Sequence, residues 1–140
     1  EEIEEDDSYF NLQYFNKSLE KEITITANIY FPAGSAELSK DAQNIIYQVV
    51  VSLNQYPNLV MTISAHTDSR GEDGSNLQLS ERRAKSVVDY ILLNDINPIR
   101  ITGKGFGETK ILNKCKSGIQ CTEDEHKINR RTEFKFIKQE

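Results

Sequence analysis

Two periodicities alternate along the chain, and their order restricts the fold more than any other feature of the sequence. Residues 23–31, ITITANIYF, alternate strictly between apolar and polar side chains, which is typical of a half-buried β-strand. The next apolar residues instead recur at the three- and four-residue spacing of an amphipathic helix. They are Ala42, Ile45, Ile46, Val49, Val50 and Leu53. Ser39 is a suitable N-cap for this helix, and Tyr56-Pro57 ends it.

The same alternation continues to the end of the chain. A strand is expected over residues 59–65, a helix over 76–94, and two further strands over 98–105 and 131–138. The order β-α-β-α-β-β indicates crossover connections. We therefore predict an α/β fold (an α+β sandwich), with a mixed four-stranded sheet and two helices packed on one face. Residues 8–22 are ambiguous, because YFNLQYF fits either an extra strand or a docked linker.

The net charge of −5 arises from one end of the chain. The opening EEIEEDD carries six acids, and without it 17 basic residues face 16 acidic ones, a balance of +1. A nearly neutral domain argues against a nucleic-acid partner, which a basic surface would attract. We predict an acidic linker or N-terminal extension over residues 1–22 and one domain over 23–140.

The sequence contains no run close to the ~18 apolar residues of a membrane helix. The longest apolar stretch, IIYQVVVSL, is interrupted by Gln48. We therefore expect no direct membrane insertion by these residues. Because Glu1 is not a natural start, the sequence is expected to be a piece of a longer protein whose anchor lies elsewhere. The oligomeric state is left open by the sequence.

The segment HTDSRGEDGSNLQLSERRA, residues 66–84, joins a strand to a helix and holds the candidate site. Asn76 and Arg83 lie seven residues apart, so they differ by only ~20° around the helix axis and share a face. The free N–H groups at such a helix start attract anions. With Asp68 as anion and Arg83 as a forked cation, the site suits a zwitterion. The apolar stripe of the helix is expected on another face, at Leu77, Ala84, Val88 and Ile91.

Other chemistries remain open at this point. His66 could act as a catalytic base, and Ser69 beside Asp68 invites a hydrolase interpretation, although no nucleophile elbow or second histidine motif accompanies them. GKGFG, residues 103–107, resembles a phosphate loop, but it ends a strand and does not open a helix. Arg82 is interpreted as a solvated charge.

Cys115 and Cys121 enclose KSGIQ in a long polar loop. Their spacing is compatible with a disulfide that closes a small ring, which would imply an oxidising compartment. A zinc site would need two more ligands, and only His126 lies near. We therefore expect a disulfide, with no metal and no cofactor.

The segment 66–84, together with GKGFGE and NRRTEF, resembles the OmpA-like peptidoglycan-binding domain, which also occurs in Pal lipoproteins and in the flagellar stator protein MotB. The resemblance extends from about residue 23 to 138. It implies that Asp68 and Arg83 hold the diaminopimelate of the peptidoglycan stem peptide. Further binding positions are implied at Asn76 and Arg130. Supporting roles are implied for His66, Thr67, Gly71, Leu79 and Asn129.

The resemblance implies a non-enzymatic, periplasmic domain of a Gram-negative bacterium. It would bind peptidoglycan non-covalently and anchor the outer membrane, or an envelope complex, to the cell wall. Two alternatives stay open: a cell-wall hydrolase or amidase that uses His66 and Asp68, and a protein-interaction domain that has lost wall binding. The chain departs from the family pattern at residues 31–34 (FPAG), at Ala65 and in the segment that carries the cysteines.

Overall fold

The four strands form one mixed sheet in the order β1-β4-β2-β3. In the computed structural model, which describes residues 12–139, the strands are β1 (Glu22–Ala27), β2 (Leu59–His66), β3 (Ile101–Gly107) and β4 (Arg131–Lys138). β4 pairs antiparallel with both β1 and β2, whereas β2 and β3 are parallel. The mixed four-stranded sheet predicted from the sequence is thereby confirmed.

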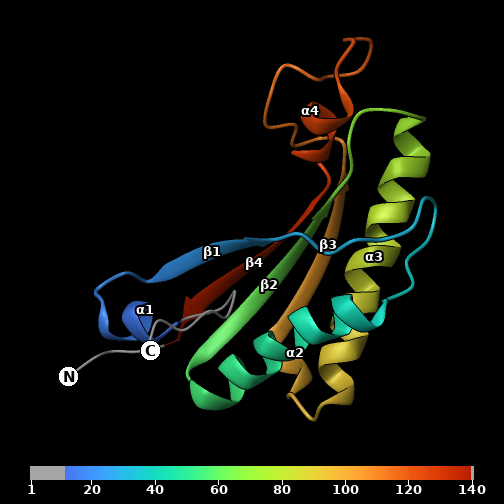
Figure 1. The fold of residues 1–140 in the computed structure, drawn as a ribbon. Coiled ribbons are helices and arrows are strands. Elements are labelled where there is room, and N and C mark those ends of the chain that lie inside the picture. Colours follow the sequence, from blue (N-terminus) through green and yellow to red (C-terminus); the bar gives the residue numbers. More distant parts are fainter. Residues whose placement is uncertain (1–11, 140) are drawn as a thin grey trace.

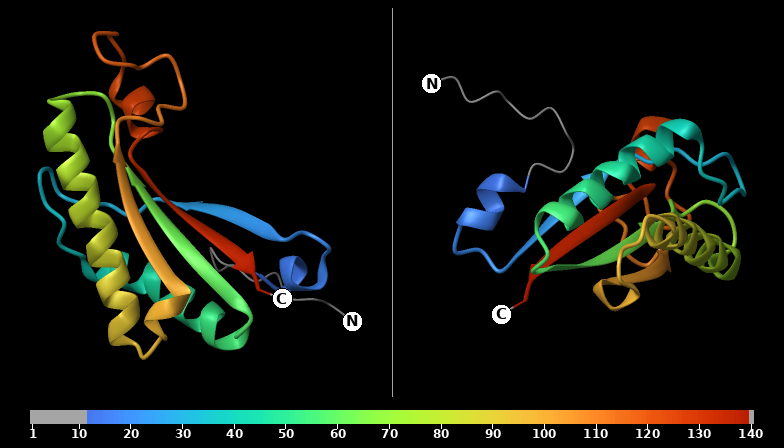
Figure 2. Two further views of the ribbon diagram at one scale, coloured as in Figure 1. Left: turned by 180° about the vertical axis from the view of Figure 1, so that it is seen from behind. Right: turned by 90° about the horizontal axis from the view of Figure 1, so that it is seen from below.

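Two long helices, α2 (Lys40–Gln55) and α3 (Asp73–Leu93), cover one face of this sheet (Figures 1 and 2). The Ser39 hydroxyl accepts the Ala42 N–H at 3.1 Å, so the predicted cap of α2 is present. Shorter helical turns are α1 (Gln13–Lys17), α4 (Glu123–Lys127) and the 3-10 turn η1 (Pro98–Arg100). Within residues 12–139, every helix is too short or too polar to cross a membrane.

The hydrophobic core lies between the sheet and the two long helices. Alternate residues of β2 and β4 point into it, whereas their neighbours face the other side of the sheet. The largest fully buried side chains include Leu59, Met61, Ile63, Phe134 and Phe136 from the strands and Ile46, Val49, Leu53, Val87 and Ile91 from the helices. Each such burial stabilises the fold by ~1.5–3 kcal/mol.

The glycines of GKGFG let α3 lie unusually close to β3. A Cβ atom at Gly105 would stand 2.2 Å from the backbone nitrogen of Glu81, and one at Gly103 would stand 2.6 Å from a methyl of Val88. The Ser80 hydroxyl also accepts the Gly107 N–H at 2.8 Å. These glycines therefore serve helix packing, which accounts for them without a phosphate ligand.

This close contact also corrects the predicted apolar stripe of α3. Leu77 is 40% exposed, because its backbone and not its side chain faces Gly107. The buried residues of the helix are Ser80, Ala84, Val87 and Ile91. The rotation of α3 about its axis is thus fixed by its contact with the β3 glycines, and a small hydroxyl takes the place expected for leucine.

Three element boundaries differ from the prediction by three residues or more. β1 ends at Ala27 and not at residue 31. Ala27 pairs with Thr132, which is the second residue of β4, so almost no partner strand remains for the residues after Ala27. β3 begins at Ile101, after the 3-10 turn that Asn97 caps. α3 begins at Asp73, three residues earlier than expected.

The ambiguous N-terminal segment contains a short docked helix. Leu12, which directly precedes α1, is 1% exposed, and Phe15 within α1 is 3% exposed. Both side chains are part of the hydrophobic core. Lys138 at the end of β4 places its ammonium 4.5 Å from the Phe15 ring centroid and donates to the Ser18 carbonyl at 2.8 Å. Leu12 and Phe15 thus pack against the domain core, although they lie in the segment 1–22 that was predicted to be a linker. The acidic opening of the chain lies outside the described residues.

Candidate binding site

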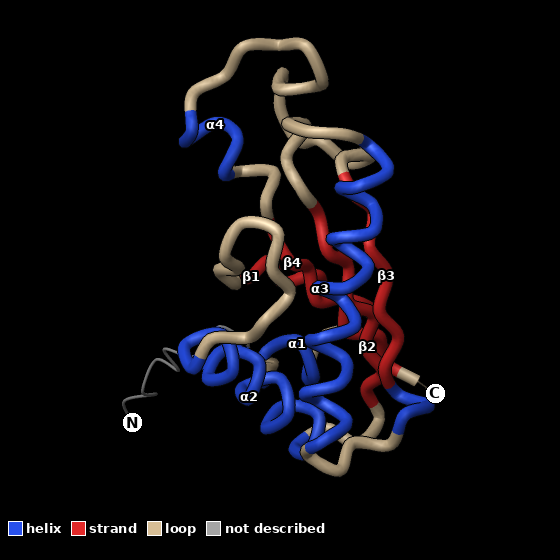
Figure 3. The backbone as a smooth tube through the Cα atoms, turned by 90° about the vertical axis from the view of Figure 1, so that its right-hand side faces the viewer, coloured by secondary structure: helices blue, strands red, loops and turns tan. Residues whose placement is uncertain are grey.

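The candidate site lies where the C-terminal end of β2 meets the N-terminal end of β4. His66, the last residue of β2, pairs with Arg131, the first of β4. The antiparallel pairing therefore brings Asp68 beside Arg130, although 62 positions separate them in the chain. Figure 3 shows that the start of α3 and the loop around α4 gather at this same end of the sheet.

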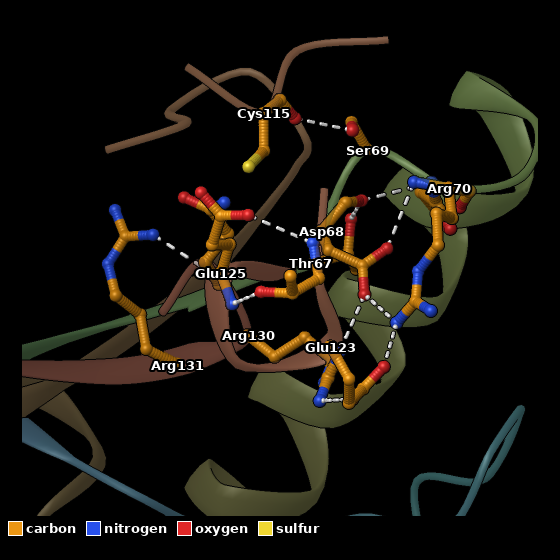
Figure 4. A network of polar contacts seen from close by, with 12 residues as sticks. Thr67, Asp68, Ser69, Arg70, Cys115, Glu123, Glu125, Arg130 and Arg131 are labelled. Carbon is orange, nitrogen blue, oxygen red and sulfur yellow. Dashed lines mark hydrogen bonds and ion pairs between the residues drawn. The ribbon is translucent and has the colours of Figure 1, made fainter. Parts of the chain in front are cut away.

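Asp68 is the centre of a network of charged hydrogen bonds (Figure 4). Its Oδ2 accepts from guanidinium nitrogens of Arg70 and Arg130, both at 2.8 Å, and its Oδ1 accepts the Arg70 backbone N–H at 2.9 Å. Burial raises the pKa of Asp68, but the hydrogen bonds from Arg70 and Arg130 outweigh it and lower the pKa to about 2. Asp68 is therefore a fixed anion at neutral pH.

Glu123, at the start of α4, closes this network from the opposite side. Its Oε1 accepts from Arg130, and its Oε2 lies 3.1 Å from the Arg70 guanidinium. Asp68, Arg70, Glu123 and Arg130 thus form a ring in which acids and guanidiniums alternate. The hydrogen bond from Arg130 is the main cause that lowers the pKa of Glu123.

Arg83 reaches the site from α3 and is held by backbone carbonyls. Its Nε donates to the Ser35 carbonyl at 2.9 Å and one terminal nitrogen donates to the Pro32 carbonyl at 3.2 Å, while the guanidinium lies 4.9 Å from the Phe31 ring centroid. Burial is the main cause that lowers its pKa, followed by the charges of Arg82 and Arg130. Within residues 12–139 no carboxylate forms an ion pair with Arg83, so its positive charge is unmatched by an acid.

These groups line one cavity of about 400 Å³. Six residues singled out from the sequence contribute to its wall: Thr67, Asp68, Asn76, Leu79, Arg83 and Arg130. The remaining wall consists of Tyr30, Phe31, Ala33, Gly34, Arg70 and Glu123. Most of the polar residues that line the cavity were therefore identified from the sequence. Their roles in binding a ligand stay predictions.

Two of the implied residues hold the site in shape. Asn76 donates from its side-chain nitrogen to the Arg70 carbonyl at 3.0 Å and to Glu108 at 3.2 Å, which fixes the turn after β2. Gly71 adopts a φ of +92°, a conformation that other residues rarely take. Asn76 thus positions the turn in addition to lining the cavity.

Asn129 lies outside the cavity and is fully buried. Its Oδ1 accepts the Leu112 N–H at 2.8 Å, and its side-chain nitrogen donates to Asn113 at 3.0 Å. Asn113 in turn donates to the Glu125 carbonyl at 2.9 Å. Asn129 therefore ties the loop 108–128 to the segment that carries Arg130.

His66 also lies outside the cavity. Its ring stacks on Phe106 with centroids 5.3 Å apart, and neither ring nitrogen has a hydrogen-bond partner within residues 12–139. Burial, with a smaller contribution from the charge of Arg131, lowers its pKa to about 4. The Ser69 hydroxyl donates to the Cys115 carbonyl at 2.5 Å and forms no hydrogen bond with either ring nitrogen of His66. This geometry gives no support to a Ser-His-Asp arrangement.

Cys115 and Cys121 form a disulfide, as the sequence predicts. Glu125 lies close to both sulfurs, but the sulfurs are bonded to each other and offer no thiolates to a metal. His126 takes no part in that group. The disulfide instead closes a ring over residues 115–121, directly before α4 and Glu123.

Comparison with known proteins identifies one matching family and several partial relatives. The model of the OmpA family matches residues 30–124. A peptidoglycan-associated lipoprotein of Agrobacterium fabrum is 28% identical over 99 residues, which cover 71% of this chain and 55% of the lipoprotein. A stretch of the photosystem I P700 chlorophyll a apoprotein A2 of Gloeobacter violaceus is 34% identical over 113 residues, 80% of this chain but only 13% of that protein.

Among solved structures, a putative MotB-like protein from Desulfovibrio vulgaris superposes with a TM-score of 0.72 at 24% identity, over 85% of this chain and 75% of that one. This likeness supports the fold. The chain spans about half or less of the length of the curated relatives above.

Proposed function

Because this chain belongs to the OmpA family, we propose that it binds peptidoglycan non-covalently and thereby anchors an outer-membrane or envelope protein to the cell wall. One relative is a peptidoglycan-associated lipoprotein, which supports this assignment. The proposed location is the periplasm, and the disulfide fits an oxidising compartment of that kind.

We further propose that the ligand is the diaminopimelate of the stem peptide. Its side chain ends in an ammonium and a carboxylate, so it needs a fixed anion and a fixed cation in one cavity. The observation that carries the proposal is that Asp68 and Arg83 line the same cavity, and that Arg83 has no acidic partner among residues 12–139. Arg83 would receive the carboxylate.

The ammonium would bind Asp68 at its Oδ1. Within the part of the chain that the structure describes, this oxygen accepts one hydrogen bond, from the Arg70 N–H, whereas Oδ2 accepts two. The site is preorganised on both sides, because backbone carbonyls hold Arg83 and two guanidiniums hold Asp68. Preorganisation lowers the entropic cost of binding.

The two alternative functions have less support. A hydrolase would need a base that touches a nucleophile. Within residues 12–139, however, the His66 nitrogens have no hydrogen-bond partner, and the Ser69 hydroxyl donates a hydrogen bond to the Cys115 carbonyl. An interaction domain that has lost wall binding would not require the cavity to retain Asp68, Arg83 and Arg130 together.

The test is affinity for a diaminopimelate-containing stem peptide, measured by calorimetry for Asp68→Asn, Arg83→Ala and the control Arg82→Ala. Removing one partner of a desolvated ion pair costs ~2–5 kcal/mol, so the first two variants should bind at least tenfold more weakly. Arg82 is exposed and outside the cavity, so its variant should bind like the wild type. Equal losses for Arg82 and Arg83, or full binding by a folded Asp68→Asn protein, would contradict the assignment.

Purified sacculi separate binding from hydrolysis. The protein should sediment with sacculi and release no soluble fragments, and the bound fraction should fall with added salt because the contacts are charged. Soluble fragments that increase with the amount of protein would instead indicate a hydrolase.

A further inference from the structure

Glu123 occupies the cavity in the manner of a bound ligand. Its two oxygens face different guanidiniums, Oε1 that of Arg130 and Oε2 that of Arg70 (Figure 4). A carboxylate bridged by two guanidiniums in this way is a strong mode of anion recognition in proteins. Glu123 comes from α4, within the loop where this chain departs from the family pattern.

The hold on Glu123 is much weaker than the hold on Asp68. The Glu123 side chain is 62% exposed, whereas that of Asp68 is 9% exposed, although both contact the same two arginines. Exposed ion pairs contribute little free energy because water screens them. Glu123 is therefore the exchangeable acid of the ring, and Asp68 is the fixed one.

The balance of charge supports an exchange. Asp68 and Glu123 together neutralise Arg70 and Arg130. When Glu123 leaves, the two arginines retain one unmatched positive charge beside that of Arg83. An incoming carboxylate restores the balance, whereas a neutral amide does not.

The loop delivers Glu123 to this position by several contacts. Thr122 caps α4, and Glu125 completes a capping box with it. The Cys115–Cys121 disulfide closes the preceding ring, and the Cys115 carbonyl accepts from Ser69 in the turn after β2. The backbone of α4 is therefore fixed, while the Glu123 side chain is mostly exposed to solvent.

We propose that Glu123 is an internal competitor that sets the selectivity of the cavity for ligands with a free carboxylate. Its own carboxylate occupies the place between Arg70 and Arg130, an anion position separate from that at Arg83, and a ligand carboxylate must displace it to bind there. The identity of the natural ligand rests on the proposed function, but the competition itself does not. The variant to examine is Glu123→Gln, which keeps the size and removes the charge.

Asp124→Asn is the matched control, because it makes the same change of charge one residue away at an exposed position outside the cavity. Two probes are used: acetate, followed by the NMR signals of the Arg70 and Arg130 guanidiniums, and a diaminopimelate-containing peptide, measured by calorimetry with its carboxylates either free or amidated. Glu123→Gln should bind acetate and the free-carboxylate peptide about three- to tenfold more tightly than the wild type, as expected for the loss of two exposed ion pairs. Asp124→Asn should differ less than about twofold, and the amidated peptide should not distinguish the variants.

The outcomes separate the two proposals. If the wild type binds the peptide and Glu123→Gln binds it no more tightly, the competition is refuted while the proposed function stands. If acetate binds Glu123→Gln more tightly but no variant binds the peptide, the competition stands and the proposed ligand is wrong. Equal acetate affinity in wild type and Glu123→Gln, or no binding to either, also refutes the competition.

Discussion

Replacing His66 by phenylalanine should make the protein more resistant to acid. The histidine is 7% exposed and stacks on Phe106, and among the described residues neither of its ring nitrogens has a hydrogen-bond partner. Phenylalanine has a similar flat shape and carries no polar atom that would need a partner. A buried polar atom without a partner costs ~1–3 kcal/mol, so His66→Phe should be at least as stable as the wild type at neutral pH.

The size of the acid effect follows from the pKa of His66. Burial is the main cause that lowers it from 6.5 to about 4; the charge of Arg131 adds to this effect, and Glu133 opposes it. Between these values the unfolded chain binds a proton at this residue and the folded chain does not. Protonation of this residue therefore leaves the free energy of unfolding unchanged above pH 6.5 and lowers it as the pH falls towards 4. The difference between these two pKa values corresponds to about 3 kcal/mol.

The assay is urea unfolding of the wild type and His66→Phe at several values between pH 7.5 and pH 4. The difference in the free energy of unfolding between the two proteins should grow by about 3 kcal/mol in favour of His66→Phe as the pH falls. Parallel profiles would show that His66 titrates alike in both states, which would refute the argument. They would also reopen a role as a catalytic base, which requires a pKa near the working pH.

Two further predictions concern packing and the loop. Gly105→Ala should destabilise the fold by about 3 kcal/mol or more in thermal or urea unfolding, because its Cβ would meet the backbone of α3 at 2.2 Å. The control Gly74→Ala should be neutral or slightly stabilising, because the nearest neighbour of its Cβ would lie at 3.6 Å. Cys115 and Cys121 should resist alkylation in unreduced periplasmic protein analysed by mass spectrometry, and two alkylatable thiols would contradict the disulfide. Replacing both cysteines by serine should lower the free energy of unfolding by about 2 kcal/mol, as expected for so small a ring.

The sequence predicted those parts of the fold that depend on local patterns. Alternation and helical spacing placed the four strands and the two long helices, since each pattern reflects one buried face. The end of β1 could not be read in this way, because it depends on where β4 begins more than a hundred residues later. The exposure of Leu77 likewise depends on the β3 glycines, which determine how α3 is rotated.

The site was predictable to the extent that it lies on regular elements or in a recognisable motif. Asp68, Arg83 and Arg130 were identified from the motif, and all three line the cavity. Arg70 and Glu123 were missed, because their position depends on how a turn and a disulfide-closed loop fold towards each other. Arg70 offered one signal, its place two residues after Asp68, and Glu123 offered none.

The position of β4 in the middle of the sheet has a consequence for how the protein is made. A chain that emerges N-terminus first presents β2, α3 and β3 early, and these neighbours can pair at once. β1 must wait, because among residues 12–139 its one strand partner is β4, with Glu22 opposite Ile137. Such distant pairings form late and slowly. Arg130 directly precedes β4 and can join Asp68 only after that part of the chain has been made, so a copy truncated before residue 130 would lack part of the cavity wall.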